Sequence, residues 1–204
     1  MELKDSGNRR KFESGAVRDI CDGKGRCDLL PMDVVAHYLG DDIFWNIKSF
    51  QESGNPEYLY RIISIAVTRF WKSDGYSMLL DVAKHFEDGA RKYGDNNWRK
   101  GIPVHCYIDS AIRHYLKHKR GDEDEPHDRA FVWNIMCAIW TCGHRPELNE
   151  YAVVNSDRKP IDNIDVRGVF MEKTMNQGFE ELLKNETPAS TALAYDEDDT
   201  ILKV

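Results

Sequence analysis

The sequence predicts an all-α protein, folded as a helical bundle. Apolar residues recur at three- and four-residue steps between positions 32 and 142, which is the spacing of amphipathic helices. Alternating strand patterns are scarce, the best being "YAVV" at 151–154. With 204 residues, 41% of them hydrophobic and 31% charged, the chain suits one globular domain with some elaboration, or two small ones.

Three parts follow one another along the chain. Residues 1–31 are polar and glycine-rich and end in "GKGRCDLLP", which predicts an irregular N-terminal arm. Residues 32–144 carry the helical periodicity, interrupted at "QESGNPE". Residues 145–204 form a C-terminal extension whose "YDEDDT" indicates a solvated acidic tail. No internal repeat is present.

Charge and cysteine usage exclude several classes of protein. The formal net charge of −7 argues against steered binding to a nucleic-acid polymer, although a local cationic pocket can still bind a small anion. Five cysteines without a C-x-x-C pair argue against a disulfide framework and against a cysteine zinc site. The polar N-terminus lacks a signal-peptide pattern, and no apolar stretch approaches the ~20 residues needed to span a bilayer. We therefore expect a cytoplasmic protein with reduced thiols and no membrane partner.

The first helix that matters for function precedes the loop "GDNNWRKG". Its expected apolar stripe borders Glu87, which lies about 100° from Phe86 around the axis. Gly94 suits the C-terminal cap. The stripe consists of Leu79, Val82, Ala83, Phe86, Ala90 and Tyr93.

Two further helices place polar groups beside the core. In one, Asp109 borders an apolar stripe and can pair with Arg113 one turn later. The stripe consists of Ile108, Ala111, Ile112, Tyr115 and Leu116. The other follows "GDEDEP", with Pro126 suited to its first position. Its shared face consists of His127, Phe131, Asn134 and Ala138.

The segment 14–31 can bring backbone and charge close to a ligand. Gly15, Gly23 and Gly25 permit close approach, and Arg18, Lys24 and Arg26 supply cations. The Walker A pattern is absent, and no strand is expected before the segment. A flexible basic arm is the competing interpretation.

Together these features predict a metal and phosphate site. Each carboxylate alone is explained by a surface ion pair (Glu87 with Arg91, Asp109 with Arg113) or by the positive N-terminus of the third helix. In a bundle, however, such positions converge on one pocket, and oxygen-rich ligand sets suit Mg²⁺ or Mn²⁺. The neighbouring cations complement a polyphosphate. They are Lys24, Arg26, Arg91, Lys92, Lys100 and Arg113.

Four stretches resemble, in order, the phage dATP/dGTP diphosphohydrolase family, which is similar to the MazG-like all-α nucleotide pyrophosphohydrolases and includes the MazZ-type enzymes. They are "SGAVRD", "GKGRCDLLP", "HFEDGARKYGDNNWRKGIP" and "YIDSAIRHYLKHKRGDEDEPHDRAFVWN". The resemblance covers 14–31 and about 80–142. Its most specific part is "KYG-x-x-NW-x-KGIP" combined with "DSA-x-RH".

The resemblance implies Mg²⁺- or Mn²⁺-dependent cleavage of a purine dNTP (dGTP, dATP or both) to dNMP and pyrophosphate during phage infection, in the host cytoplasm. It also implies a homo-oligomer, dimer or tetramer. Carried over by position, the candidate metal ligands or water-orienting groups are Glu87, Asp109, Asp124, Glu125 and His127, of which Glu87, Asp109 and His127 are the expected catalytic residues. The candidate phosphate contacts are Lys24, Arg26, Lys92 and Lys100, with Asn97 and Trp98 near the nucleoside. Arg18, Arg113 and Asn134 complete the expected substrate-binding set.

Two departures separate this chain from the MazG-like pattern. Only one clear helical Glu stands where paired E-x-x-E and E-x-x-D motifs are usual. About forty extra residues, roughly 38–78, also separate "DLLP" from the first site helix. We treat this stretch as an insertion, either an oligomerisation element or packing decoration.

Two rival functions stay open from sequence. An HD-type triphosphohydrolase would use His127 and Asp128, with His85 or His114 upstream and Asp157 or Asp165 as the distant acid. A helical nucleotide-sensing or host-interaction protein without catalysis is the second. Glu87→Gln is predicted to keep the fold and abolish turnover.

Overall fold

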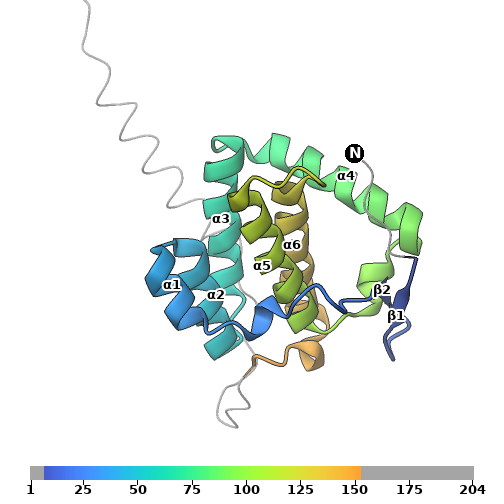
Figure 1. The fold of residues 1–204 in the computed structure, drawn as a ribbon. Coiled ribbons are helices and arrows are strands. Elements are labelled where there is room, and N and C mark those ends of the chain that lie inside the picture. Colours follow the sequence, from blue (N-terminus) through green and yellow to red (C-terminus); the bar gives the residue numbers. More distant parts are fainter. Residues whose placement is uncertain (1–6, 153–204) are drawn as a thin grey trace, which may run out of the picture. The chain divides into compact units, whose positions relative to one another are not determined.

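The computed structural model describes residues 7–152, and these confirm the all-α prediction. Six α-helices and a two-stranded hairpin make up the described part, with short 3-10 turns between them (Figure 1). The helices are α1 Met32–Leu39, α2 Asp42–Ser53, α3 Glu57–Trp71, α4 Gly75–Tyr93, α5 Val104–Arg120 and α6 His127–His144. The strands are β1 Arg9–Lys11 and β2 Val17–Asp19, and the turns are η1 Cys27–Leu29, η2 Asn97–Lys100 and η3 Pro146–Leu148.

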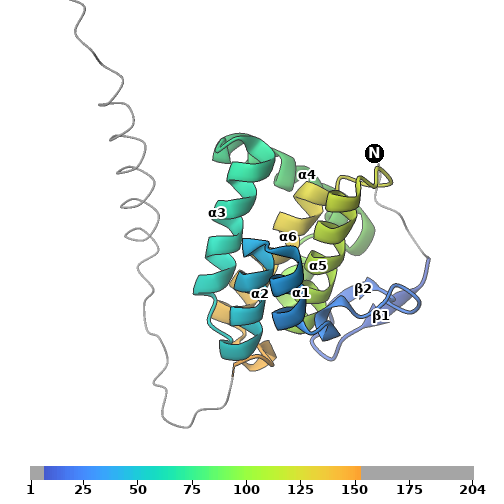
Figure 2. The same cartoon turned by 60° about the vertical axis from the view of Figure 1, so that its left-hand side comes forward.

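Helix α5 lies at the centre of the bundle. It runs beside α6, while α1, α2 and α3 pack together on another side (Figures 1 and 2). The stripe predicted for α5 is confirmed, since Ile108, Ala111, Ile112 and Tyr115 are fully buried. Each large apolar side chain buried in this way stabilises the fold by roughly 1.5–3 kcal/mol.

The extra stretch at 38–78 is helical. It forms the end of α1, then α2 and α3, and its break at "QESGNPE" coincides with the gap between Ser53 and Glu57, as predicted. Asp41 caps α2 by accepting a hydrogen bond from the Ile43 amide at 3.0 Å. The same carboxylate accepts from Arg69 on α3 at 2.6 Å and from the Tyr115 hydroxyl on α5 at 2.5 Å. This cap therefore also fastens α2 and α3 to the central helix.

Helix α4 presents a different face to the interior from the one predicted. Met78, Val82 and His85 are buried, whereas Leu79 is 49% exposed and Ala83 is also exposed. Of the predicted stripe, only Val82 is fully inside. The face is turned because polar residues of α4 line a cavity, so the inward side is not its most apolar side.

Of the three remaining predictions about local structure, two are confirmed and one is off by one residue. Gly94 caps α4, with its amide donating to the Ala90 carbonyl, as predicted. The α6 face of His127, Phe131, Asn134 and Ala138 is buried, as predicted. Pro126 lies one position before the helix rather than at its first residue.

One prediction about strands is wrong where the structure describes it. Strand β1 precedes the 14–31 segment, because residues 9–11 pair antiparallel with 17–19. Tyr151 and Ala152 lie in a turn and a bend, and positions 153–154 of the "YAVV" pattern lie outside the described residues. Among residues 7–152, no helix is long and apolar enough to cross a bilayer.

Candidate active site

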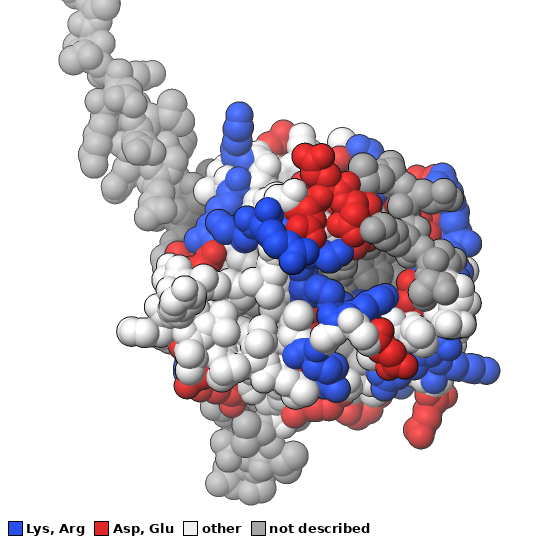
Figure 3. Space-filling view, viewed as in Figure 1, with Lys and Arg blue, Asp and Glu red and all other residues white. Residues whose placement is uncertain are grey.

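A cavity of about 770 Å³ opens between the β-hairpin, α4, the loop around η2, α5 and the start of α6. Its size falls within the range of small-molecule sites. Figure 3 shows Lys and Arg side chains along the edge of a hollow on this face, with acidic side chains above it. The cations lining the cavity include Arg18, Lys24, Arg26, Lys92, Arg113 and Lys117, and the aromatic residues include Phe86, Tyr93, Trp98 and Trp133.

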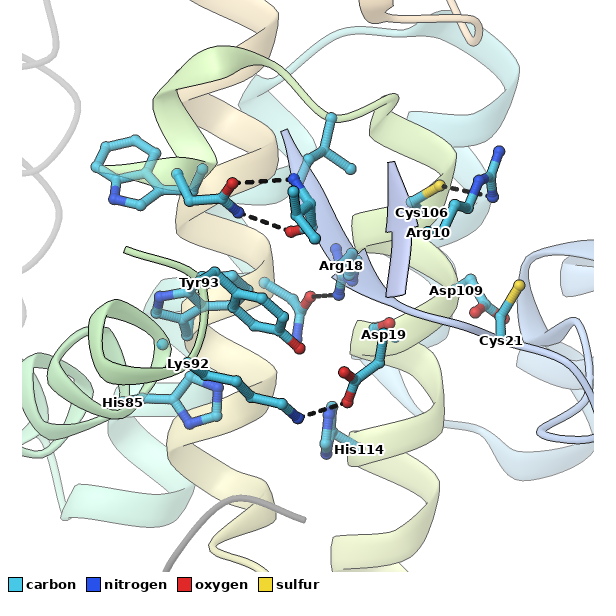
Figure 4. Close-up of a pocket in the computed structure, with 18 of the residues that line it drawn as sticks. Arg10, Arg18, Asp19, Cys21, His85, Lys92, Tyr93, Cys106, Asp109 and His114 are labelled. Carbon is cyan, nitrogen blue, oxygen red and sulfur yellow. Dashed lines mark hydrogen bonds and ion pairs between the residues drawn. The ribbon is translucent and has the colours of Figure 1, made fainter. Parts of the chain in front are cut away.

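The hairpin is held in the cavity wall by Asn97. Its side-chain oxygen accepts from the Val17 amide at 2.9 Å, and its amide nitrogen donates to the Val17 carbonyl at 2.7 Å. Lys92 on α4 adds an ion pair with Asp19, 2.6 Å away and largely buried (Figure 4). The loop predicted to face the nucleoside therefore first positions β2, while Trp98 packs against Phe86 and Trp140.

Arg18 points from β2 into the cavity. One guanidinium nitrogen, Nη2, donates to the Asn134 side chain at 2.6 Å, as drawn in Figure 4. Asn134 is 1% exposed, and its own amide nitrogen donates to the Ala130 carbonyl at 2.8 Å. The guanidinium carbon lies 5.1 Å from the centre of the Tyr107 ring. Arg18 is thus held on two sides, which orients the rest of its guanidinium group.

His114 and Glu125 line one end of the cavity, and His127 lies beside them outside the lining. His114 on α5 and His127 at the start of α6 face each other, with their Nδ1 atoms 3.1 Å apart. Glu125 lies 3.5 Å from His114 and 3.6 Å from His127. Burial and the neighbouring His127 hold the pKa of His114 well below its usual range, so its imidazole is neutral at pH 7.

Asp124 and Asp122 extend this group. Asp124 lies 2.7 Å from the His127 Nε2 and 3.0 Å from the Lys117 ammonium. Two sets of side chains in the described residues have ligand atoms close enough together to hold a metal ion: His114, Glu125 and His127, and Asp122, Asp124 and His127. Neutral imidazoles and carboxylates are metal donors, so both sets fit a divalent cation.

Asp109 and Glu87 lie apart from these two sets. Asp109 is buried, pairs with Arg113 as predicted, and accepts from the Cys27 amide at 2.7 Å. Glu87 is exposed on the cavity rim and pairs with Arg91. Both interactions match the ion-pair explanations available from sequence.

The predicted substrate contacts do not all lie in the cavity. Most line the cavity, but Lys100 is exposed outside the lining, and its carbonyl accepts from Arg145 at 2.7 Å. Arg26 lines the cavity and pairs with Asp28 at 2.5 Å. Lys24 lines it on the exposed loop before η1.

Three further residues of the cavity are not evident as site residues from the sequence: His85, which is buried, and His114 and Trp133, which are partly buried. His85 is 6% exposed, and burial together with the positive charges of Arg129 and Arg18 lowers its pKa to about 3. The signal for His114 was its position five residues after Asp109 in "DSAIRH". No periodicity reveals His85, because a histidine on an inward face looks like any other break in an apolar stripe.

One comparison with known proteins matches a segment that includes three of the helices around this cavity. The family model described as "dATP/dGTP diphosphohydrolase, N-terminal" matches residues 75–151, the segment that contains α4, α5 and α6. No curated protein and no solved structure matches the chain. Over residues 75–151, which are less than half of its length, the chain is similar to the dATP/dGTP diphosphohydrolase family.

Proposed function

We propose that the chain hydrolyses purine deoxynucleoside triphosphates between the α and β phosphorus atoms, in a reaction that depends on Mg²⁺ or Mn²⁺. The products are dNMP and pyrophosphate. The observation that carries the proposal is the group formed by His114, Glu125 and His127 beside a cavity lined with cations and aromatic rings. That combination suits a ligand with a flat base at one end and several negative charges at the other.

The donor set favours Mn²⁺ over Mg²⁺. Mg²⁺ is bound mainly by oxygen ligands, whereas two imidazoles contribute to this group. When bound, the ion would lower the pKa of the attacking water and neutralise charge that develops on the phosphates. We therefore place the metal at His114, Glu125 and His127, with Asp124 orienting His127, rather than at the Glu87 and Asp109 positions taken from the resemblance.

The cations of the cavity have separate tasks in this scheme. Lys117 lies beside Asp124 and so is near the metal group, whereas Arg113 pairs with Asp109, apart from it. Both cations line the cavity and can meet phosphate oxygens. Lys24 and Arg26 approach from the 14–31 segment. We accordingly propose that 1–31 is a phosphate-binding arm, 32–144 the catalytic domain and 145–204 an extension.

The position of water attack tests the reaction. The protein is incubated with each of the four dNTPs and Mn²⁺ or Mg²⁺ in H₂¹⁸O, and the products are identified by ³¹P NMR and mass spectrometry. We expect dNMP and pyrophosphate from purine substrates, with one labelled oxygen in one of the two products. Nucleoside with triphosphate would reject the proposal.

The HD-type triphosphohydrolase is the second candidate, because His114 and His127 do meet at 3.1 Å. Its adjacent Asp128 lies outside both metal-binding groups and instead accepts from the Arg129 amide at 2.7 Å. The candidate distant acids Asp157 and Asp165 lie outside the described residues. Release of triphosphate is the result that would favour this function. Nucleotide binding without turnover would favour a sensor.

The biological setting follows from the resemblance. We propose that the enzyme reshapes the purine nucleotide pool of a phage-infected host cytoplasm, acting as a homodimer or homotetramer. Light scattering coupled to size-exclusion chromatography measures the assembly directly. A monomer at assay concentration with full activity would remove oligomerisation from the proposal.

A further inference from the structure

Four buried side-chain atoms of residues that line the cavity have no hydrogen-bond partner among residues 7–152. They are Arg18 Nη1, Trp133 Nε1, His85 Nδ1 and Arg113 Nε, from β2, α6, α4 and α5. An unpaired buried polar atom costs about 1–3 kcal/mol, so native structures leave few of them. Several around one cavity indicate a ligand that supplies the missing partners.

Three of the four, Arg18, Trp133 and His85, form one patch. The His85 and Trp133 ring centres are 5.2 Å apart, and the Arg18 guanidinium carbon lies 6.0 Å from the Trp133 ring centre. The His85 residue is only 6% exposed, and Figure 4 shows it with Arg18 at the same cavity. Arg18 is already fixed by Asn134 and Tyr107. The patch is therefore rigid before any ligand enters.

The chemistry of the patch selects the ligand. Arg18 Nη1 and Trp133 Nε1 can only donate hydrogen bonds. Guanine offers two adjacent acceptors on one edge, O6 and N7, whereas adenine pairs the acceptor N7 with the donor N6 amino group. We propose that Arg18 and Trp133 read the O6 and N7 edge of guanine, so that the enzyme prefers dGTP to dATP. This inference rests on the proposed function.

The phosphates have another place to bind. Asn134, the partner of Arg18, lies seven residues after His127 on α6, which is about 10 Å along the helix. The metal group and Lys117 are at the His127 end. The donor patch is flanked by the Tyr107 and Phe86 rings, and an aromatic surround suits a base better than a triphosphate.

Substrate analogues test the inference on the unmodified protein. The ratio of kcat/KM for dGTP, dITP, 7-deaza-dGTP and dATP is measured with Mn²⁺. We expect dITP to match dGTP, because it keeps O6 and N7, and 7-deaza-dGTP and dATP to fall by about 10- to 100-fold. Equal values for dGTP and dATP, or no loss with 7-deaza-dGTP, would overturn the inference.

Two variants locate the effect. Trp133→Phe keeps an aromatic ring and removes the N–H, and should narrow the dGTP to 7-deaza-dGTP ratio to within about threefold. Trp140→Phe, on the same helix but outside the cavity lining, is the matched control and should leave the ratio unchanged. An unchanged ratio in Trp133→Phe would remove Trp133 from base recognition.

Binding separates this inference from the proposed function. The affinities of non-hydrolysable α,β-imido analogues of dGTP and dATP are measured by calorimetry. Selective binding of the guanine analogue without turnover of any dNTP would reject the reaction and keep base recognition. Turnover of both purines with equal affinities would keep the reaction and reject base recognition.

Discussion

The side-chain amide of Asn97 pairs with both backbone groups of Val17, at 2.9 Å and 2.7 Å. Asn97 is 6% exposed. One side chain thus joins the N-terminal hairpin to the loop between α4 and α5. Because the next residue after Val17 is Arg18, this pairing also sets the direction from which Arg18 enters the cavity.

Asn97→Ala should reduce both stability and substrate affinity. It leaves the amide and carbonyl of Val17 without partners, which costs about 2–3 kcal/mol in unfolding free energy. We expect KM to rise more than kcat falls, because Arg18 loses its position while the metal group is untouched. Urea unfolding and steady-state kinetics measure the two effects. Asn46→Ala, which removes one exposed bond within α2, is the control and should change neither.

Glu125→Gln and Glu87→Gln distinguish the two possible metal positions. Glu125→Gln removes the charge of the carboxylate between His114 and His127, and should lower kcat at least about a hundredfold with the fold retained. Glu87→Gln removes an exposed ion pair with Arg91, and should lower kcat much less. A loss in Glu87→Gln as large as in Glu125→Gln would return Glu87 to the metal site, as the sequence alone predicts.

His114→Ala should weaken metal binding independently of turnover. The imidazole is one of three donors in its group, so the dissociation constant for Mn²⁺ should rise at least about tenfold. Electron paramagnetic resonance of free Mn²⁺ measures this without substrate. His118→Ala, one turn further on α5 and outside both metal groups, serves as the comparison. Identical Mn²⁺ affinity in wild type and His114→Ala would move the metal elsewhere.

Chelation gives the complementary measurement. Dialysis against EDTA should abolish pyrophosphate release, and Mn²⁺ should restore it at lower concentration than Mg²⁺, because imidazole donors favour Mn²⁺. Restoration by Mg²⁺ at the lower concentration would instead indicate an all-oxygen site.

Asp41 should make stability depend on pH in the acid range. Burial alone would raise the pKa of Asp41, but hydrogen bonds from Tyr115 and Arg69 lower it below its usual value. A lowered pKa in the folded state means that the stabilisation is present above about pH 4 and disappears as pH falls through the folded pKa. Asp41→Asn should therefore destabilise the protein by about 2 kcal/mol at pH 7 and by much less at pH 3. Denaturation of both proteins at the two pH values checks this.

Asp42→Asn is the matched control for Asp41, since Asp42 is the next residue and its side chain is 71% exposed. Its effect should stay below about 0.5 kcal/mol at either pH. Equal effects of the two substitutions would mean that Asp41 acts only through the general charge of the helix N-terminus.

The sequence was informative where one driving force acts alone. The α5 stripe is correct because that helix is surrounded by core, and apolar burial alone decides which side faces inward. On α4 the prediction of the buried face was wrong, because polar side chains turn inward. Asp88 pairs with Arg129, Lys92 pairs with Asp19, and His85 lines the cavity. Hydrophobic periodicity cannot detect an inward face made of polar residues that find partners on other elements.

By itself, the sequence determined the helical class, the cap at Gly94, the Asp109–Arg113 pair and the similarity of residues 75–151 to a known family, because each depends on neighbours within a few positions or on a continuous motif. Only the tertiary structure decided that His114 and His127 meet across 13 residues and that Arg18 reaches Asn134 across 116. Such contacts depend on how helices cross and where a hairpin docks. Those orientations are set by the packing of the whole core.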